Sequence, residues 1–358
     1  MPATETKTPG PVQRPVTAVD LARELGVSIA TVSFVLNGLA KKNKISDKTA
    51  ARVIEAAKRL NYVPNQAARN LQSSRSGMIG IILGNFKLEW AEAAMLGIQE
   101  VFDKTDYVPF VATHGFDAER NRKELLSSIK RRDEGVIAFP MPNCDDLYRN
   151  IVRAGAPLVF LGDEMEGLAD INSVVWDSEP AAEAVVRHLI EIGRKRIAFF
   201  GCDYPGIAPT RRFEAYRRVL QENGLEFREE WVAFPHASLD PDEMTRLAMR
   251  KFFSDPTHTP DAIFAVCDGL ALPALEYLHG AGVSVPGDVA VVGMQDLPLS
   301  SHWAIGLTTV REPVREMGRL AAQLLLDLIS GDVQSPVHHE ISSSDVLIRQ
   351  TTSALSTR

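Results

Sequence analysis

Cysteine is scarce in this chain of 358 residues, which holds only Cys144, Cys202 and Cys267, far apart in the sequence. No pair has the spacing of a zinc site, so we predict neither a disulfide framework nor a metal site, and no cofactor. This usage suits a reducing compartment, and we expect the protein in the cytoplasm.

Long apolar runs are also missing, and no segment has the length and apolarity that a membrane span requires. The Pro- and Thr-rich N-terminus lacks the apolar centre of a signal peptide. With 45% hydrophobic and 24% charged residues, the composition fits a globular protein of two or three domains. A disordered, collagenous or disulfide-stapled chain is excluded.

An excess of basic charge is absent from the whole chain, whose formal net charge is -7. The charge is unevenly distributed, however. Residues 1–77 contain twelve Lys and Arg against five Asp and Glu, which gives +7 and leaves −14 for the remainder. This asymmetry predicts a basic nucleic-acid-binding module attached to an acidic body.

Three short helical patterns follow a tail over residues 1–14 that we expect to be disordered. Thr17 with Asp20 forms a capping-box-like start, Ser28 caps a second helix that runs to Asn37, and Ser46 caps a third. The residues expected to face inward are Ala18, Leu21, Ala22 and Leu25; Val32, Val35 and Leu36; and Ala50, Val53, Ile54, Ala57 and Leu60. A helix, a turn at a glycine and a short second helix are typical of helix-turn-helix DNA-binding domains, although any small helical bundle would also fit.

The pattern changes at Met78, after a short helix-compatible segment and a Ser/Arg/Gly linker. Short apolar runs then alternate with longer helical patterns, which predicts parallel sheets covered by helices in two α/β subdomains. The predicted strands are 78–83, 108–112, 135–139, 157–162, 173–176, 196–201, 231–234, 262–266 and 289–294. The predicted helices include 118–131, 180–192, 210–223, 241–253, 269–280 and 315–329. His338 and His339 are expected in a surface turn.

Several motifs together resemble the lactose-repressor (LacI/GalR) family of bacterial transcription regulators. They include TVSFVLN, NYVPNQAARNL, RRFEAYRRVL, DVAVVGMQD and VLIRQTT, within residues 15–352. The resemblance implies an all-α helix-turn-helix domain and an α/β core of two Rossmann-like subdomains, as in periplasmic binding proteins. It also implies a homodimer.

After the tail over residues 1–14, the resemblance divides the chain into four parts. The helix-turn-helix domain covers residues 15–63, and the hinge helix with its linker covers 64–77. The N-terminal core subdomain combines 78–176 with 311–340, and the C-terminal one combines 177–310 with 341–352.

The helix over residues 28–37 is placed in the DNA major groove by this resemblance, with Ile29, Ala30 and Phe34 toward the bases. Apolar side chains can touch thymine methyl groups but cannot form the paired bonds that Arg makes to guanine. Many relatives carry Arg at the position of Phe34, so the operator sequence stays open. The alternative is that Phe34 completes the three-helix core.

Short polar residues and a lysine-rich loop surround that helix. The polar residues are Thr17, Ser28, Thr31, Ser33, Asn37, Ser46 and Thr49. They can cap helices, contact phosphates or do both. The loop carries Lys41, Lys42 and Lys44 and is longer than that of the lactose repressor. We predict that these lysines add phosphate contacts, although a solvated charge cluster is the usual role of such a run.

The hinge segment Asn65 to Leu71 matches the family segment that folds on operator DNA. By resemblance, Leu71 enters the central minor-groove step as a wedge, with Ala68 beside it and Asn65 at the helix start. The alternative is that Leu71 packs on its own core.

An effector is expected between the two core lobes, most often a sugar in this family. The candidate contacts are Trp90, Asp163, Arg212, Cys267, Asp268 and Gln295. Arg212 falls on the family's pocket arginine, although it could instead be a surface residue. Trp90 could stack on a ring or lie in the core, and Cys267 could be a buried small apolar residue.

The pocket motifs depart from the pattern of sugar-binding relatives. Cys267 precedes Asp268 where Asn is common, Gln295 stands where Asp is common, and Gly162 precedes Asp163 where the lactose repressor has Asp. A non-standard sugar, a sugar acid and no effector at all therefore stay open.

Taken together, these observations predict a DNA-binding transcription regulator of a metabolic operon. We expect it to bind a pseudo-palindromic operator as a dimer and to respond to a sugar or sugar derivative. Repression is the family's usual outcome. An enzyme is disfavoured because no nucleophile elbow, phosphate-binding loop or HExxH motif occurs. A small-molecule-binding protein without a regulatory role is the remaining alternative, and the basic N-terminal segment argues against it.

Overall fold

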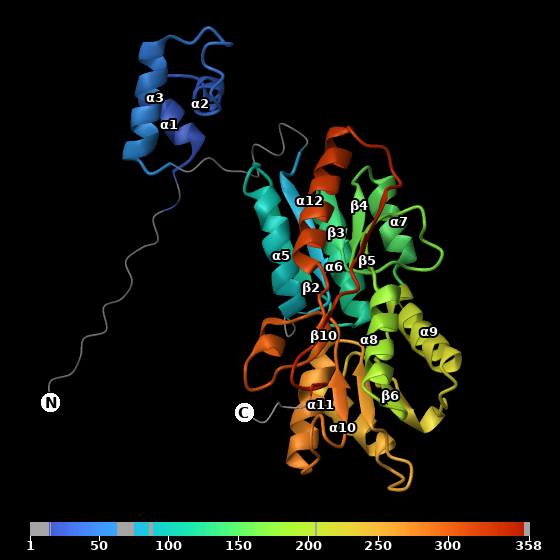
Figure 1. Cartoon of the computed structure of the whole chain (residues 1–358). Coiled ribbons are helices and arrows are strands. Elements are labelled where there is room, and N and C mark those ends of the chain that lie inside the picture. Colours follow the sequence, from blue (N-terminus) through green and yellow to red (C-terminus); the bar gives the residue numbers. More distant parts are fainter. Residues whose placement is uncertain (1–13, 15, 63–74, 86–88, 205, 354–358) are drawn as a thin grey trace, which may run out of the picture. The chain divides into compact units, whose positions relative to one another are not determined.

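The structure is a computed structural model that describes residues 14, 16–62, 75–85, 89–204 and 206–353. The chain divides into two compact units, Met1–Arg75 and Ser76–Arg358. Figure 1 shows both units, of which the first is all-α and the second contains every described strand.

The first unit contains three helices, α1 Ala18–Leu25, α2 Ile29–Leu36 and α3 Asp47–Arg59. Each begins where the sequence predicts a cap. Thr17 and Asp20 form a reciprocal capping box, while the hydroxyls of Ser28 and Ser46 accept hydrogen bonds from backbone N–H groups of their helices. Gly26 ends α1 in the left-handed conformation, with φ of 66°, which turns the chain tightly into α2.

The core of this unit is small and almost as predicted. Leu21, Val32 and Val53 are fully buried at its centre. The prediction for Ile54 is wrong, because this side chain is 44% exposed, and Ala56 is buried instead. The buried stripe of α3 runs through Val53, Ala56 and Ala57, so a residue one step after Val53 points away from α1 and α2.

The second unit contains two parallel sheets and a short antiparallel pair. The first sheet has the order β11-β5-β4-β3-β1-β2, the second has the order β7-β6-β8-β9, and β10 pairs with β12. The strands are β1 Met78–Leu83, β2 Val108–Thr113, β3 Gly135–Ala138, β4 Leu158–Leu161, β5 Asn172–Asp177, β6 Ile197–Phe200, β7 Val232–Ala233, β8 Ala262–Ala265, β9 Ala290–Val292, β10 Thr309–Val310, β11 His338–Ser342 and β12 Val346–Leu347. The helices are α5 Glu89–Phe102, α6 Ala118–Arg131, α7 Asp145–Arg153, α8 Glu179–Glu191, α9 Ile207–Glu222, α10 Pro241–Phe252, α11 Asp268–Gly280 and α12 Val314–Ser330.

The central strands are buried on both faces, which is why they read as continuous apolar runs in the sequence. The nine predicted strands and six predicted helices are all present, with ends shifted by a few residues. Helices α5 and α7 and the strands β10, β11 and β12 were not predicted. His338 and His339 lie in the edge strand β11, in register with Ser173 and Val174 of β5, so their predicted position in a turn is wrong.

The chain crosses between the two sheets repeatedly. It leaves the first sheet after β5, returns before α12 and leaves again after β11. The predicted subdomain limits at residues 176 and 340 therefore fall inside β5 and β11, both of which pair entirely within the first sheet.

Helices α5 and α12 lie side by side against the first sheet (Figure 1). Two glycines allow their backbones to meet. A Cβ atom on Gly97 would collide with the carbonyl oxygen of Arg315, and one on Gly318 would collide with that of Ala94. Because glycine has no side chain, the backbones of the two helices can approach each other closely at these positions.

Candidate DNA interface and effector cavity

Helix α2 presents an apolar outer surface. Ile29 is 50% exposed, Ala30 is exposed, and Phe34 is partly exposed and is not one of the side chains packed into the three-helix core. This position favours the outward-facing role of Phe34 over the alternative in which it completes that core. These three side chains offer carbon surface and no hydrogen-bond donor to a partner.

The hydroxyl groups around α2 are engaged in capping. The Ser28 Oγ accepts from the Thr31 N–H at 3.0 Å, and the Ser46 Oγ accepts from the Thr49 N–H at 3.2 Å. At the C-terminal end of α2, the Asn37 amide donates to the Ser33 Oγ at 3.3 Å. These bonds establish the structural role of the residues, and their contact with phosphate stays a prediction.

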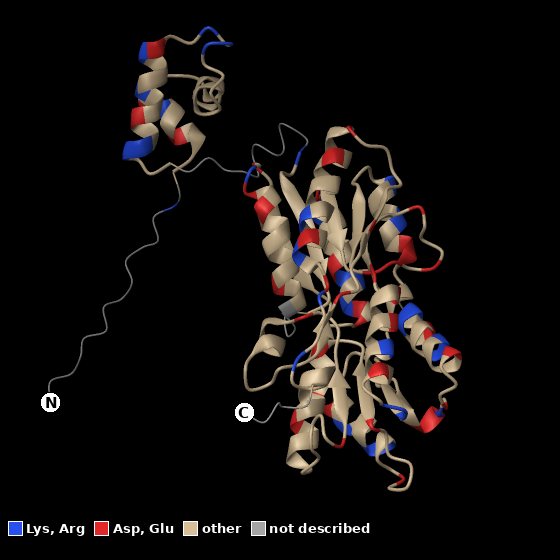
Figure 2. Cartoon of the chain, in the orientation of Figure 1, with Lys and Arg blue, Asp and Glu red and all other residues tan. Residues whose placement is uncertain are grey.

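The loop between α2 and α3 is basic and exposed. Lys41, Lys42 and Lys44 are exposed, and Figure 2 shows the basic colour of this loop. Lys44 has φ of 54° in the tight turn that leads to α3. Ammonium groups on an exposed loop next to an N-terminal helix cap can reach a phosphate backbone without reading its sequence. The hinge residues Asn65, Ala68 and Leu71 lie outside the described residues.

A cavity of about 250 Å³ lies between the two sheets of the second unit. Five of the six predicted effector contacts line it, namely Trp90, Asp163, Arg212, Cys267 and Gln295. Four of them follow strands or begin helices at the carboxyl ends of both sheets, which is where α/β folds bind ligands, and Arg212 lies in the second turn of α9.

Arg212 points from α9 into the cavity wall. Its Nε donates to the Ser178 Oγ at 2.9 Å and its Nη1 donates to the Val266 carbonyl at 3.0 Å. The guanidinium carbon also lies 5.3 Å from the ring centre of Trp176. Among the described residues, Nη2 has no hydrogen-bond partner, so this fixed cation can still donate to a ligand. The interpretation of Arg212 as a free surface residue is thus not supported.

Asp163 joins the two halves of the second unit. It follows β4 of the first sheet, and its Oδ1 accepts from the N–H groups of Ile207 and Ala208 at the start of α9 in the other half, at 3.1 and 3.0 Å. The negative carboxylate thereby caps the positive end of the helix dipole. Burial raises the pKa of Asp163 to about 6, against the opposing effect of these backbone hydrogen bonds and of the Arg212 charge.

Comparisons with protein families and known proteins find a matching domain for each of the two units. The model of bacterial regulatory proteins of the lacI family matches residues 17–65, and the periplasmic-binding-protein-like domain matches residues 186–352. The transcriptional regulator CelR of Thermobifida fusca is 31% identical over 321 residues, which are 87% of this chain and 91% of that protein. The chain belongs to the lacI family of bacterial regulatory proteins.

Two solved structures resemble this LacI-family protein over nearly the whole chain. A CelR–cellobiose complex is 27% identical with a TM-score of 0.70 and matches 94% of this chain and 99% of the other. The lac repressor dimer bound to operator and the anti-inducer ONPF is 25% identical with a TM-score of 0.77 and matches 95% and 100%. The fold is therefore a helix-turn-helix domain joined to a periplasmic-binding-protein-like α/β core.

Glu312 is a cavity residue of this LacI-family protein that the sequence analysis missed. It follows β10, its side chain is buried, and its Oε1 accepts from the Trp90 indole N–H at 2.9 Å. Burial raises the pKa of Glu312, while the Arg212 charge and hydrogen bonds from Trp90 and Gln295 oppose the rise. It stands two residues after β10, and this two-residue strand leaves no local pattern in the sequence that could have marked it.

An aromatic wall was also missed. Phe116, Phe139 and Tyr204 line the cavity and contact one another, with ring centres 5.4 to 6.0 Å apart. Trp90 continues this wall, with its ring centre 5.6 Å from that of Phe139. Gly162 makes room for it, since φ of +95° and a Cβ only 2.7 Å from the Trp90 ring would disfavour any other residue there.

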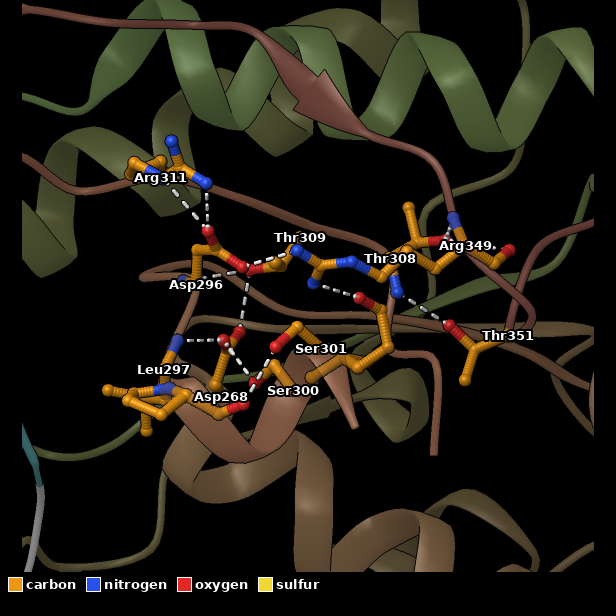
Figure 3. Close-up of polar contacts among 12 residues, drawn as sticks. Asp268, Asp296, Leu297, Ser300, Ser301, Thr308, Thr309, Arg311, Arg349 and Thr351 are labelled. Atoms are coloured by element: carbon orange, nitrogen blue, oxygen red, sulfur yellow. Dashed lines mark hydrogen bonds and ion pairs between the residues drawn. The ribbon is translucent and has the colours of Figure 1, made fainter. Parts of the chain in front are cut away.

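Asp268 has a different place from the predicted one. It is fully buried, does not line the cavity, and accepts from the Leu297 N–H, the Ser300 hydroxyl and the Thr309 hydroxyl at 3.0, 2.6 and 2.7 Å (Figure 3). All of these partners lie in the segment after β9 or in β10. We therefore correct its role from ligand contact to anchor of that segment.

A second acid continues this anchor. Asp296 pairs with Arg311 at 2.8 Å and with Arg349 at 2.6 Å, which ties the segment to the C-terminal residues (Figure 3). Gln295 directly precedes Asp296 and has φ of 127°, a conformation that non-glycine residues rarely adopt. The network thus holds a strained residue in the cavity wall.

Cys267 lines the cavity as a neutral thiol. Burial raises its pKa to about 12, so it contributes packing surface and not a thiolate.

Among the described residues, no group of three or more His, Cys, Asp and Glu side chains gathers as a metal site would require. No helix in the described part of the chain has the length and apolarity to cross a membrane.

Proposed function

We propose that this LacI-family protein is a transcription regulator of a metabolic operon, and a repressor in its usual mode. The observation that carries the proposal is the presence, in one chain, of a helix-turn-helix unit and of a cavity lined from two sheets. A transport-associated binding protein would share the second feature and lack the first. The proposal includes no catalytic step, and such a regulator works in the cytoplasm, where the DNA is.

The DNA-binding face in this proposal is the outer surface of α2 with the lysine loop after it. Ile29, Ala30 and Phe34 contact thymine methyl groups, and the lysines with the capping hydroxyls contact phosphates. In the hinge, Leu71 enters the central minor-groove step with Ala68 beside it, and Asn65 starts the hinge helix. Because a homodimer presents two such faces, the operator is pseudo-palindromic. The lac repressor relative is a dimer bound to its operator, which supports this arrangement.

The effector in this proposal binds in the cavity, in contact with Trp90, Arg212, Gln295 and Glu312. A relative bound to cellobiose supports a sugar or sugar derivative as its class. Asp163 with the start of α9, and the Tyr204 hydroxyl with the Pro140 carbonyl, are hydrogen bonds between the two halves of the second unit. A ligand that changes the distance between these two halves also changes the spacing of the segments that lead to the DNA-binding units.

The test is a selection of DNA sequences from a random library by the full chain, followed by affinity measurements at fixed salt. We expect pseudo-palindromic half-sites with A·T pairs under α2, and an affinity that changes when a cavity ligand is added. Selection of no common sequence would contradict the proposal.

A further inference from the structure

Two cysteines that are far apart in the sequence meet in the wall of the cavity. Cys202 and Cys267 both line it, and both are free thiols. Cys202 follows β6 and Cys267 follows β8, and these strands pair in parallel with Phe200 opposite Ala265. Each cysteine stands two positions after one member of that pair. Because side chains alternate between the faces of a strand, the two thiols lie on the same face, at the same level of neighbouring strands.

The two segments stay adjacent beyond the last residues of their strands. The Val266 N–H donates to the Phe200 carbonyl at 3.0 Å, which continues the ladder by one residue. Cys267 keeps an extended backbone, with φ of -152° and ψ of 155°, and Asp203 still pairs in parallel with His236. Neighbouring strands lie about 4.8 Å apart, and the Cα atoms of disulfide-bonded cysteines lie about 4.4–6.8 Å apart. The fold therefore gives this pair the backbone spacing that a disulfide requires.

Burial keeps both thiols protonated in the closed cavity. It raises the pKa of Cys202 to about 11 and that of Cys267 to about 12, and the proximity of Cys202 adds to the rise at Cys267. The charge of Arg212 acts in the opposite direction on both thiols. Water that enters an opened cavity removes the burial and leaves the Arg212 charge, which favours the reactive thiolate.

The pair lies beside the hydrogen bonds that join the two halves of the second unit. Tyr204, two residues after Cys202, donates its hydroxyl proton to the Pro140 carbonyl in the other half. Asp163 accepts from the start of α9 across the same boundary, and its charge acts on the Cys202 thiol. Separation of the halves breaks these bonds and exposes both thiols to small solutes, and exposure is what makes cysteines susceptible to oxidation.

We propose that Cys202 and Cys267 are a redox-active pair that a small peroxide converts into a disulfide. One thiolate attacks the O–O bond of hydrogen peroxide and becomes a sulfenic acid, with release of one water. The second thiol then attacks the sulfenic sulfur, and a second water leaves. Two thiols and one hydrogen peroxide thus give one disulfide and two waters, and the two electrons lost by the sulfurs reduce the peroxide.

The disulfide alters the cavity wall. The Cβ atoms of a disulfide lie about 3.8 Å apart, closer than neighbouring strands, so the bond pulls the carboxyl ends of β6 and β8 together. The Val266 carbonyl, which accepts from Arg212, lies directly before Cys267 and moves with it. An effect of this movement on DNA binding rests on the proposed function, in which the cavity controls the DNA-binding units. Formation of the disulfide does not.

The test maps the cysteines of the full chain after treatment with hydrogen peroxide. The remaining thiols are alkylated, and the digested protein is analysed by mass spectrometry with and without dithiothreitol. We expect peptides joined through Cys202 and Cys267, and full reversal by dithiothreitol. Cys202→Ser and Cys267→Ser each abolish the link. Cys144→Ser is the matched control and retains it, because Cys144 is fully buried in a separate core cluster.

The second measurement compares the reduced and the disulfide forms by fluorescence anisotropy on the selected operator. We expect the affinity to differ by about fivefold or more, the usual size of a coupling between two sites. Absence of the link, a link through Cys144 or between two chains, or irreversible oxidation of single cysteines overturns the inference. A mapped disulfide with unchanged operator affinity overturns its effect on regulation. Absence of sequence-specific DNA binding in both forms contradicts the proposed function and leaves the disulfide standing.

Discussion

Asp163 combines three backbone hydrogen bonds on one oxygen with burial, and its raised pKa of about 6 has a consequence for stability. The folded state holds the proton more tightly than the unfolded chain, whose pKa is near 3.8. Below that value both states are protonated. The contribution of the Asp163 carboxyl to the free energy of unfolding is therefore fully present below about pH 4 and is lost as the pH rises from about 4 to about 6.

We expect Asp163→Asn to become more stable relative to the wild type as the pH rises through this range. The amide oxygen still accepts from α9 and is never ionised, so the melting temperature of the variant minus that of the wild type should rise between pH 4 and 6 and level off above. Asp255→Asn is the control, because hydrogen bonds from Thr257 lower the pKa of this exposed residue to about 2. A flat difference for Asp163→Asn would contradict the assignment.

Glu312 offers a second test at the scale of one residue. Glu312→Gln keeps the shape of the side chain and the acceptor for the Trp90 indole, but it replaces the charged acceptor Oε2 with an amide nitrogen. Loss of a hydrogen bond to a charged group should weaken a bound sugar or sugar derivative by about tenfold, measured by titration calorimetry. Glu316→Gln, on the neighbouring helix and outside the cavity, should leave the affinity unchanged. Equal effects of the two variants would remove Glu312 from the site.

Single residues also show where sequence reasoning stops. The caps at Thr17, Ser28 and Ser46 were predictable because capping depends on neighbours a few positions away. Asp268 was not, because its partners Leu297, Ser300 and Thr309 are distant in sequence and consume its carboxylate. An acid at the end of a strand has the same sequence pattern whether it contacts a ligand or anchors a loop.

At the scale of elements, the contact between α5 and α12 depends on glycine. Gly97→Ala would place a methyl group against the Arg315 backbone, and overpacking of this kind costs about 1–3 kcal/mol or more. We expect a lower melting temperature. Gly280→Ala, in helix α11 with open space around its Cβ position, should be neutral or slightly stabilising. Similar melting temperatures for the two variants would contradict the close approach.

The loop between α2 and α3 is a second element with a measurable role. Replacing Lys41, Lys42 and Lys44 together by Ala should reduce the slope of log affinity against log salt by about 1 to 3, because each phosphate contact releases about one counterion. The control replaces Lys123, Lys130 and Lys195, which all lie in the other unit. An unchanged slope in the loop variant would assign the lysines to solvation alone.

Elements differed in how well the sequence predicted them. Buried strands such as β1 and β8 were found because every position is apolar. The strands β10 and β12 are two residues long and exist because they pair with each other, so no local pattern marks them. The aromatic wall was invisible for the same reason, since Phe116, Phe139 and Tyr204 meet only after three strand ends converge.

At the scale of the whole molecule, the predicted hinge should couple the two units on DNA. Leu71→Ala should weaken binding to the selected operator far more than binding to random DNA, because a minor-groove wedge acts only where the central step is kinked. Fluorescence anisotropy with both DNAs measures this. Leu247→Ala, on the exposed side of α10, should change neither affinity. Equal losses on both DNAs in Leu71→Ala would count against the wedge.

The order in which the chain emerges during synthesis limits how early the second unit can fold. Strands β1 to β5 are made first, but their covering helix α12 and their edge strand β11 come from Val314–Ser330 and His338–Ser342, near the end of the chain. Until then β5 exposes an unpaired edge and the sheet lacks part of its cover, which favours aggregation. A ribosome that stalls or terminates before residue 314 would therefore release a fragment that needs chaperones and cannot complete either half.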